Sequence, residues 1–233
     1  MRFMKYSRCR AFAAGFALAS GLQAADTINP TPNLLVEGIP PIPAAIAEDV
    51  KRYTESRSAG FGGWHPQRRE MLITTRFANT AQIHQVAAPL GMRRQMTFFD
   101  EPVGSGGYDP LRGEFFLFSR DTGGNEFSQL YRYDFADGRT TMLTDGGRSQ
   151  NGFGVWSPDY KLRLYSSTRR NGADRDIYVM DPRDPKKTDR LVLQVSGGGW
   201  GAQDWSPDGR TLMVGEYISV NESHLWLVDI ATG

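Results

Sequence analysis

Trp205-Ser206-Pro207-Asp208-Gly209 is the fullest of four copies of one short phrase, in which an aromatic residue leads into a turn. The earlier copies are Trp64-His65-Pro66, Tyr108-Asp109-Pro110 and Trp156-Ser157-Pro158-Asp159. The steps from one aromatic residue to the next are 44, 48 and 49 residues long. A period of about 40–50 residues, filled with short strands and turns, is typical of the blades of a β-propeller.

Each copy of the phrase is followed by an apolar run that predicts a strand. These runs are residues 71–73, 115–118, 162–165 and 212–214. In three copies a further apolar run ends at an Asp, over residues 130–134, 177–181 and 225–229. The glycine-rich residues 152–155, which precede Trp156, predict an inner strand, because glycine lets backbones approach closely near an axis. Outer strands are predicted at 140–143 and 190–194, so that four short strands make one blade.

The fold class predicted from this pattern is all-β, a partial β-propeller of about four blades, each a four-stranded antiparallel sheet. The blades are expected near residues 58–103, 104–150, 151–199 and 200–233. The fourth repeat stops at residues 229–233, where an outer strand should begin. Because an unclosed propeller exposes sheet edges that natural proteins avoid, we expect the chain to be the front part of a longer protein.

The N-terminal residues predict an exported protein. Residues 1–24 resemble a signal peptide, with four basic residues at the start, the apolar core 11–22 and a small residue, Ala24, at the expected cleavage point. Residues 25–57 follow as an extension with a Pro-rich tether over 26–43 and a short amphipathic helix over 44–53. The expected location is the periplasm or the medium of a bacterium.

Charge and cysteine content exclude several classes of protein. Without residues 1–24 the chain has 23 basic and 26 acidic residues, so its net charge is −3. It then has no basic face for nucleic acid and no polybasic membrane patch. Cys9 is the only cysteine and lies inside the predicted signal peptide, which excludes disulfides and thiolate catalysis in the mature chain. No later segment is long enough for a membrane anchor.

No catalytic, cofactor-binding or metal-binding residue is predicted. Residues 147–151 contain Ser149 but lack the second glycine of a Gly-x-Ser-x-Gly elbow, so we interpret them as a loop at a blade junction. The three histidines, His65, His84 and His224, match no metal or triad spacing and are expected on the surface or packed in strands. The acidic loop around Asp174 and Asp176 lacks the pattern of a calcium site.

Two further groups of residues carry structural hypotheses. The glycine-rich residues 197–201 have no helix after them to orient a phosphate, and they are interpreted as the start of the fourth inner strand. Trp64, Trp156 and Trp205 recur at one place in the repeat, which favours packing between blades. A binding hypothesis remains for Arg169, Arg170 and Arg175, which could line a channel mouth and hold a peptide carboxylate.

The run from Trp205 to Val214, with the later Leu225-Trp226-Leu227-Val228-Asp229, resembles the TolB-type propeller repeat. The order of parts from Ile39-Pro40-Pro41-Ile42-Pro43, through a short helix, to Ser58-Ala59-Gly60-Phe61-Gly62-Gly63-Trp64 resembles the N-terminal region of a bacterial serine peptidase of the prolyl oligopeptidase family. This resemblance covers residues 35–233. Its repeat motif is specific for the fold and poorly specific for function, because unrelated binding proteins use the same blades.

The resemblance implies a substrate-gating and scaffolding role without chemistry of its own. In that family the propeller lies over an α/β-hydrolase domain, admits peptides and excludes folded proteins, while the hydrolase supplies the Ser, Asp and His. No position of this chain matches those residues. The implied partners are therefore a C-terminal α/β-hydrolase domain of the same parent chain and peptide substrates, with no cofactor. The alternative is a TolB-like periplasmic scaffold that joins protein partners and has no enzyme activity.

Overall fold

A computed structural model describes residues 26–233, and these residues form two compact units that divide between residues 56 and 57. The predicted signal peptide, residues 1–24, lies outside the described residues. In the first unit the predicted helix is confirmed as α1 (Ala44–Thr54). Lys51 pairs with Glu48 and Arg52 with Asp49 on its exposed surface.

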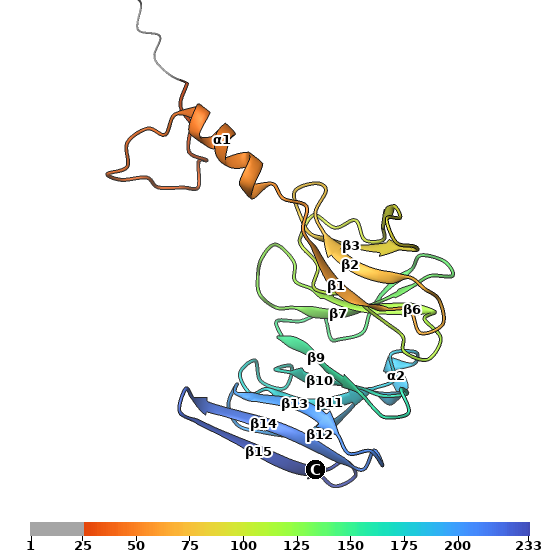
Figure 1. Ribbon diagram of the computed structural model, residues 1–233. Coiled ribbons are helices and arrows are strands. Elements are labelled where there is room, and N and C mark those ends of the chain that lie inside the picture. The colour runs from red at the N-terminus through yellow and green to blue at the C-terminus, as the bar shows by residue number, and fades with distance from the viewer. Residues whose placement is uncertain (1–25) are drawn as a thin grey trace, which may run out of the picture. The chain divides into compact units, whose positions relative to one another are not determined.

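The second unit contains four antiparallel sheets, one for each copy of the repeat (Figure 1). The first sheet consists of β1 (Ala59–Trp64), β2 (Met71–Thr75), β3 (Gln82–Val86) and β4 (Arg93–Gln95). The second consists of β5 (Gly107–Tyr108), β6 (Phe115–Arg120), β7 (Gln129–Asp134) and β8 (Thr140–Met142). The third consists of β9 (Asn151–Trp156), β10 (Arg163–Ser167), β11 (Asp176–Met180) and β12 (Arg190–Leu193). In every sheet the strands are paired in chain order, which confirms the predicted blade.

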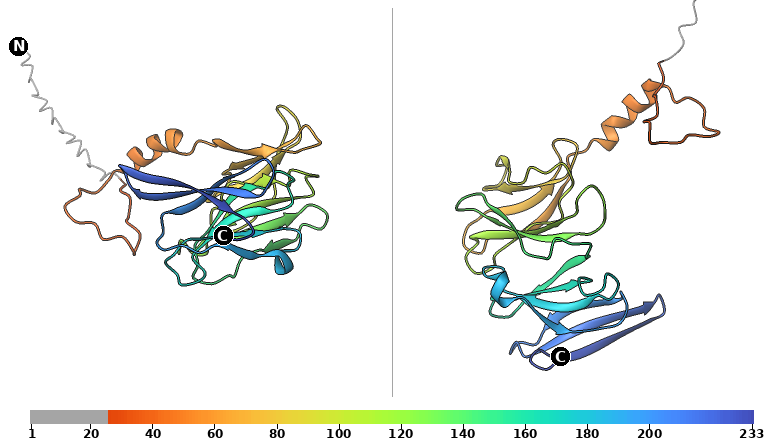
Figure 2. Two further views of the ribbon diagram at one scale, coloured as in Figure 1. Left: turned by 90° about the horizontal axis from the view of Figure 1, so that it is seen from below. Right: turned by 180° about the vertical axis from the view of Figure 1, so that it is seen from behind.

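The fourth sheet has three strands, β13 (Trp200–Trp205), β14 (Thr211–Ser219) and β15 (Glu222–Asp229), as the position of residues 229–233 in the repeat predicts. β14 and β15 are longer than the apolar runs suggested, and Figure 2 shows them as one extended hairpin in blue. Only Val220 and Asn221 separate the two strands. A two-residue connection forms a tight hairpin, whereas the corresponding strands of the third sheet are separated by the polar loop 168–175.

The repeated phrase folds as a turn whose second residue holds the following backbone. The hydroxyl of Ser157 donates a hydrogen bond to Asp159 (2.7 Å) and accepts one from the backbone N–H of Leu162 (2.9 Å). Ser206 makes the same two bonds, to Asp208 and from Thr211. In the first sheet His65 takes this place, and its Nδ1 accepts the N–H groups of Gln67 and Arg68. The turn thus keeps its place in the repeat, while its side chain and the N–H groups that this side chain accepts change.

The hydrophobic core lies between successive sheets. Between the first and second sheets pack Leu72, Ile83, Tyr108, Phe116 and Phe118. Between the second and third pack Phe115, Leu117, Leu130, Tyr165 and Tyr178. Between the third and fourth pack Leu164, Ile177, Val179, Leu212 and Val214. The second and third sheets therefore use both faces, and their alternating side chains belong to two different cores, whereas the first and fourth sheets contribute to one core each.

The predicted packing role of the three tryptophans is right for two of them and wrong for the third. Trp205 is 8% exposed and packs with Leu164 and Val179 of the third sheet, and Trp156 is partly buried against the core of the second. Trp64 is 60% exposed. The aromatic residue of the phrase packs on the preceding sheet, and among the described residues no sheet precedes the first.

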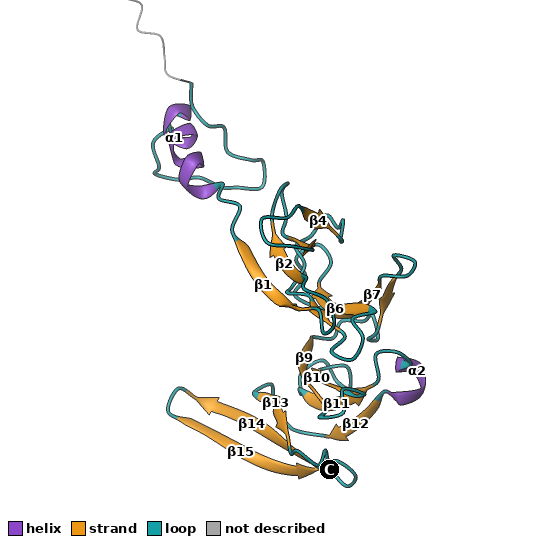
Figure 3. Ribbon diagram, turned by 45° about the vertical axis from the view of Figure 1, so that its right-hand side comes forward, coloured by secondary structure: helices purple, strands orange, loops and turns teal. Residues whose placement is uncertain are grey.

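A short helix, α2 (Pro185–Thr188), interrupts the predicted strand-and-turn region (Figure 3, purple). Pro185 supplies a backbone angle suited to the first helical position, and the hydroxyl of Thr188 donates to the carbonyl of Asp184 (2.7 Å). The sequence lacks the long apolar period that would have predicted it, because a single helical turn needs none.

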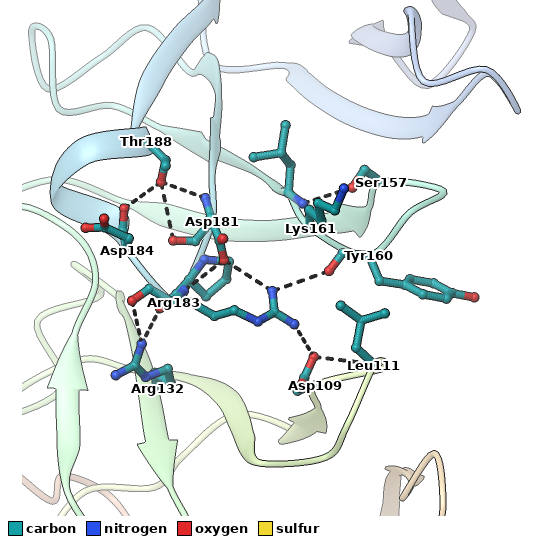
Figure 4. A network of polar contacts seen from close by, with 12 residues as sticks. Asp109, Leu111, Arg132, Ser157, Tyr160, Lys161, Asp181, Arg183, Asp184 and Thr188 are labelled. Atoms are coloured by element: carbon teal, nitrogen blue, oxygen red, sulfur yellow. Dashed lines mark hydrogen bonds and ion pairs between the residues drawn. The ribbon is translucent and has the colours of Figure 1, made fainter.

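A polar network joins the second and third sheets just before this helix (Figure 4). Arg183 contacts the buried carboxylate of Asp109 (2.6 Å) and that of Asp181 (3.2 Å). Arg132 of β7 donates to the carbonyl oxygen of Pro182 (2.6 Å). Asp109 also accepts the N–H groups of Leu111 and Arg112, so its charge is satisfied from both sheets.

Candidate functional site

The first strands of the four sheets, β1, β5, β9 and β13, are the inner strands, and β1 contacts β5 while β9 contacts β13. A methyl group added to Gly62 of β1 would lie 2.3 Å from the carbonyl oxygen of Gly106, just before β5. This close approach explains the need for glycine at position 62. Where the inner strands separate, the structure leaves two cavities, one on each side of β9.

The first cavity, of about 240 Å³, is bounded by Gly107 and Leu117 of the second sheet and by Phe153, Trp156 and Arg163 of the third. A methyl group added to Gly107 would meet no atom within 4 Å, so this side of the cavity is open space. Arg163 is the one charged residue among those that line it. The hydroxyl-bearing residue Ser105, exposed to solvent, lies at its rim.

Arg163 has no ion pair and no side-chain hydrogen bond with any residue in the range 26–233. Its guanidinium carbon lies 5.3 Å from the ring centre of Phe153 and 5.3 Å from that of Trp156. Its Nε is buried without a hydrogen-bond partner. Burial lowers the pKa of Arg163 to about 10, which leaves the group charged at neutral pH. Arg163 could not be selected from the sequence, because the alternation of side chains along a strand does not show what either face of the strand packs against.

The second cavity, of about 270 Å³, lies on the other side of β9 and is lined by Gly152, Phe153, Arg175 and Trp200, among others. Arg175 donates to the side-chain oxygen of Gln150 (2.9 Å) and has no carboxylate partner within the described residues. Each of the two cavities beside β9 is thus lined by one arginine that no acid of residues 26–233 neutralises.

The other two arginines of the binding hypothesis are neutralised. Arg169 pairs with Asp189 and its guanidinium lies 3.9 Å from the ring centre of Tyr178. Arg170 bridges Asp174 (2.9 Å) and Asp176 (2.6 Å), which also engages the acidic loop considered above. Of the three arginines selected from the sequence, only Arg175 therefore retains a charge that a ligand could neutralise.

Ser149 is a structural residue at the junction between β8 and β9. It is 2% exposed, and its hydroxyl donates to Asp145 (2.5 Å) and accepts from the amide of Asn151 (3.0 Å). No histidine is among its hydrogen-bond partners in the described residues. A buried hydroxyl that already donates to a carboxylate, with no base beside it, is not positioned as a nucleophile.

The three histidines lie on separate elements. His65 is buried in its turn, and burial is the main cause that lowers its pKa. His84 is buried in β3, where its Nδ1 bonds to the carbonyl of Gln82 (3.0 Å), and burial lowers its pKa as well. His224 lies on the exposed side of β15, 3.3 Å from Glu216. Across residues 26–233 no cluster of three or more His, Cys, Asp or Glu side chains is arranged to hold a metal ion.

Comparison with solved structures identifies the architecture. A TolB structure from Acinetobacter baumannii aligns with a TM-score of 0.53 and 19% identity over 76% of this chain. A putative TolB from Agrobacterium tumefaciens aligns with a TM-score of 0.53 and 20% identity over 73% of it. The fold is that of a TolB-like β-propeller. The chain spans 42% and 61% of the lengths of these two TolB chains.

The same fold is shared with enzymes. A prolyl endopeptidase structure aligns with the propeller at a TM-score of 0.56 and 14% identity, over 80% of this chain and 31% of the enzyme. An oligogalacturonate lyase in complex with manganese aligns at a TM-score of 0.53 over 70% of this chain and 47% of its own. No family model and no curated protein matches the sequence. Identities of this size define the fold, and function has to be argued from the site.

Proposed function

We propose that the chain is the substrate-gating propeller of an exported serine peptidase of the prolyl oligopeptidase family, whose α/β-hydrolase domain lies elsewhere in the parent chain. The observation that carries the proposal is the alignment with a prolyl endopeptidase, which covers 80% of this chain but only 31% of the enzyme. This is the relation expected between one domain and a larger enzyme that contains it.

Two features of the site support a role without chemistry of its own. Ser149, the serine nearest to an elbow motif, is buried against Asp145. The cavities beside β9 present arginines and aromatic rings, which bind and orient ligands. Within residues 26–233 no helix is long and apolar enough to cross a membrane, and export is part of the proposal.

The proposal is tested with a fluorophosphonate probe, which labels activated serine nucleophiles. The chain ending at Gly233 should remain unlabelled, whereas the protein encoded by the full reading frame should be labelled and should cleave short peptides in preference to folded proteins. Labelling of the chain itself would contradict the proposal, since it would reveal a nucleophile within it.

A second candidate, a TolB-like periplasmic scaffold with no enzyme activity, is favoured by the alignment with two TolB structures. The coding frame beyond Gly233 separates the two candidates. A stretch of roughly 250 residues with Gly-x-Ser-x-Gly and a late His supports the peptidase. A few more blades followed by a stop support the scaffold.

A further inference from the structure

The residue paired with the aromatic of the repeated phrase is apolar in three sheets and charged in the third. Trp64 pairs with Met71, Tyr108 with Phe116 and Trp205 with Leu212. Phe116 and Leu212 are fully buried in the cores towards the preceding sheet. In the third sheet Trp156 pairs with Arg163, so this blade places a guanidinium where the second and fourth sheets place core side chains.

A charged side chain at this position lowers the free energy of unfolding unless an opposite charge or a hydrogen-bond acceptor compensates it. Arg163 finds no acid within the described residues, and its Nε is buried without an acceptor. Replacing such a group by an apolar side chain ordinarily stabilises a protein. The rings of Phe153 and Trp156 offset part of the cost through cation–π contacts, but they leave the buried Nε–H without an acceptor.

The cavity beside Arg163 supplies the space that an acceptor would need. It holds about 240 Å³, and Gly107 opposite leaves it unfilled. No acidic residue lines it, and Arg163 is its only charge. One guanidinium matches a monoanion, whereas a phosphate dianion would keep an uncompensated charge in a site walled by Leu117, Phe153 and Trp156.

We propose that this cavity, between β5, β9 and β10, is a binding site for a carboxylate, held by the fork of N–H groups on Arg163. The planar guanidinium suits bidentate binding of a carboxylate, and the two rings fix its orientation. Such a carboxylate can come from the C-terminus of a peptide or from a small organic acid. The site does not depend on the proposed peptidase role, since a scaffold could bind peptide ends equally well.

The test is an NMR titration of the full chain, in which the Arg163 Nε–H signal is identified by its absence from the Arg163→Met variant. The probes are acetyl-glycyl-glycine, its C-terminal amide and acetate. We expect a saturable shift with the free carboxylate and none with the amide. Calorimetry should show binding about 10- to 100-fold weaker in Arg163→Met, because one charge-assisted bidentate contact is lost.

Two further variants control the result. Arg139→Met removes an exposed arginine that pairs with Asp137 and does not line the cavity, so it should leave binding unchanged. Gly107→Val places a side chain in the first cavity and leaves Arg163 unchanged, so it should abolish binding as well. Arg163→Met itself should be as stable as the parent chain or more so.

Binding of both acetate and the peptide acid supports the site with a peptide end as ligand, and binding of acetate alone supports it with a small acid. Equal binding of acid and amide, unchanged binding in Arg163→Met, or no saturable shift with either carboxylate would overturn it. A marked loss of stability in Arg163→Met would also overturn it, because the guanidinium would then be a packing element.

Discussion

Trp205 and Trp64 occupy the same place in the same phrase, yet one is 8% exposed and the other 60%. Trp205 packs into the core that the third and fourth sheets share, while Trp64 contacts Phe61 of its own strand (5.7 Å between ring centres). The motif therefore supplies only one of the two surfaces that pack together. The other surface is the face of the preceding sheet, and in the described chain no sheet precedes the first.

The largest expected effect comes from removing the two tryptophans in turn. Trp205→Ala should lower the free energy of unfolding by about 3–5 kcal/mol, because it leaves a cavity in a shared core. Trp64→Ala should change it by less than about 1 kcal/mol, because an exposed ring loses little on truncation. Urea unfolding followed by circular dichroism measures both. Similar losses for the two variants would break the comparison.

The ion pair between the second and third sheets should show the next largest effect. Arg183→Ala leaves the buried carboxylate of Asp109 without its cation, at a cost of about 1–3 kcal/mol. Lys161→Ala, in the exposed pair with Asp159, is the control and should cost at most about 1 kcal/mol. If both variants unfold at the same denaturant concentration, the network of Figure 4 does not hold the two sheets together.

Two glycines test the close approach of the inner strands. Gly62→Ala should destabilise the chain by about 1–3 kcal/mol, because its methyl group would lie 2.3 Å from the carbonyl oxygen of Gly106. Gly107→Ala, which points into open space, should be close to neutral. The shift in thermal midpoint distinguishes them, and a neutral Gly62→Ala would mean that β1 and β5 do not meet as described.

The smallest effect is a dependence on pH at the interface between the first two sheets, where His65 packs edge-on against Tyr108 (5.0 Å). Burial lowers the pKa of His65 from 6.5 in the folded state, so the unfolded chain binds the proton more tightly. Stability is therefore full above about pH 6.5 and falls as the pH decreases below that value.

His65→Asn is the variant that isolates this effect. An Asn side-chain oxygen can accept the N–H groups of Gln67 and Arg68, as Asp109 accepts the N–H groups two and three residues on in its own turn, while removing the titration. The slope of stability against pH between 5 and 6.5 should become shallower than in the parent chain, with the remainder due to His84. An unchanged slope would show that His65 does not contribute.

Repetition is what made the fold predictable. The apolar runs, the turn at Ser157 and Ser206 and the short helix α1 could be predicted because each is a local pattern. The environment of Trp64, by contrast, depends on a neighbouring sheet, which a motif does not encode. The single turn of α2 is too short to have a period.

The candidate site was less predictable, because it too depends on contacts between sheets that a local motif does not encode. The sequence suggested a binding role for Arg169, Arg170 and Arg175, which lie in one polar loop. In the structure, two of them pair with acids that only the fold brings close. Arg163 looked like an ordinary strand residue. The strand register pairs Arg163 with Trp156. In the second and fourth sheets the same register position holds Phe116 and Leu212, which are core residues, so Arg163 occupies a core position.

The central claim is that each repeat is a blade whose aromatic residue packs on the blade before it. Nuclear Overhauser effects from the indole of Trp205 test it most directly, in a chain with methyl-labelled Leu and Val. The account predicts contacts to the methyl groups of Leu164 and Val179 in the third sheet, and none from Trp64 to the second, third or fourth sheets. Contacts from Trp205 confined to its own sheet would contradict it.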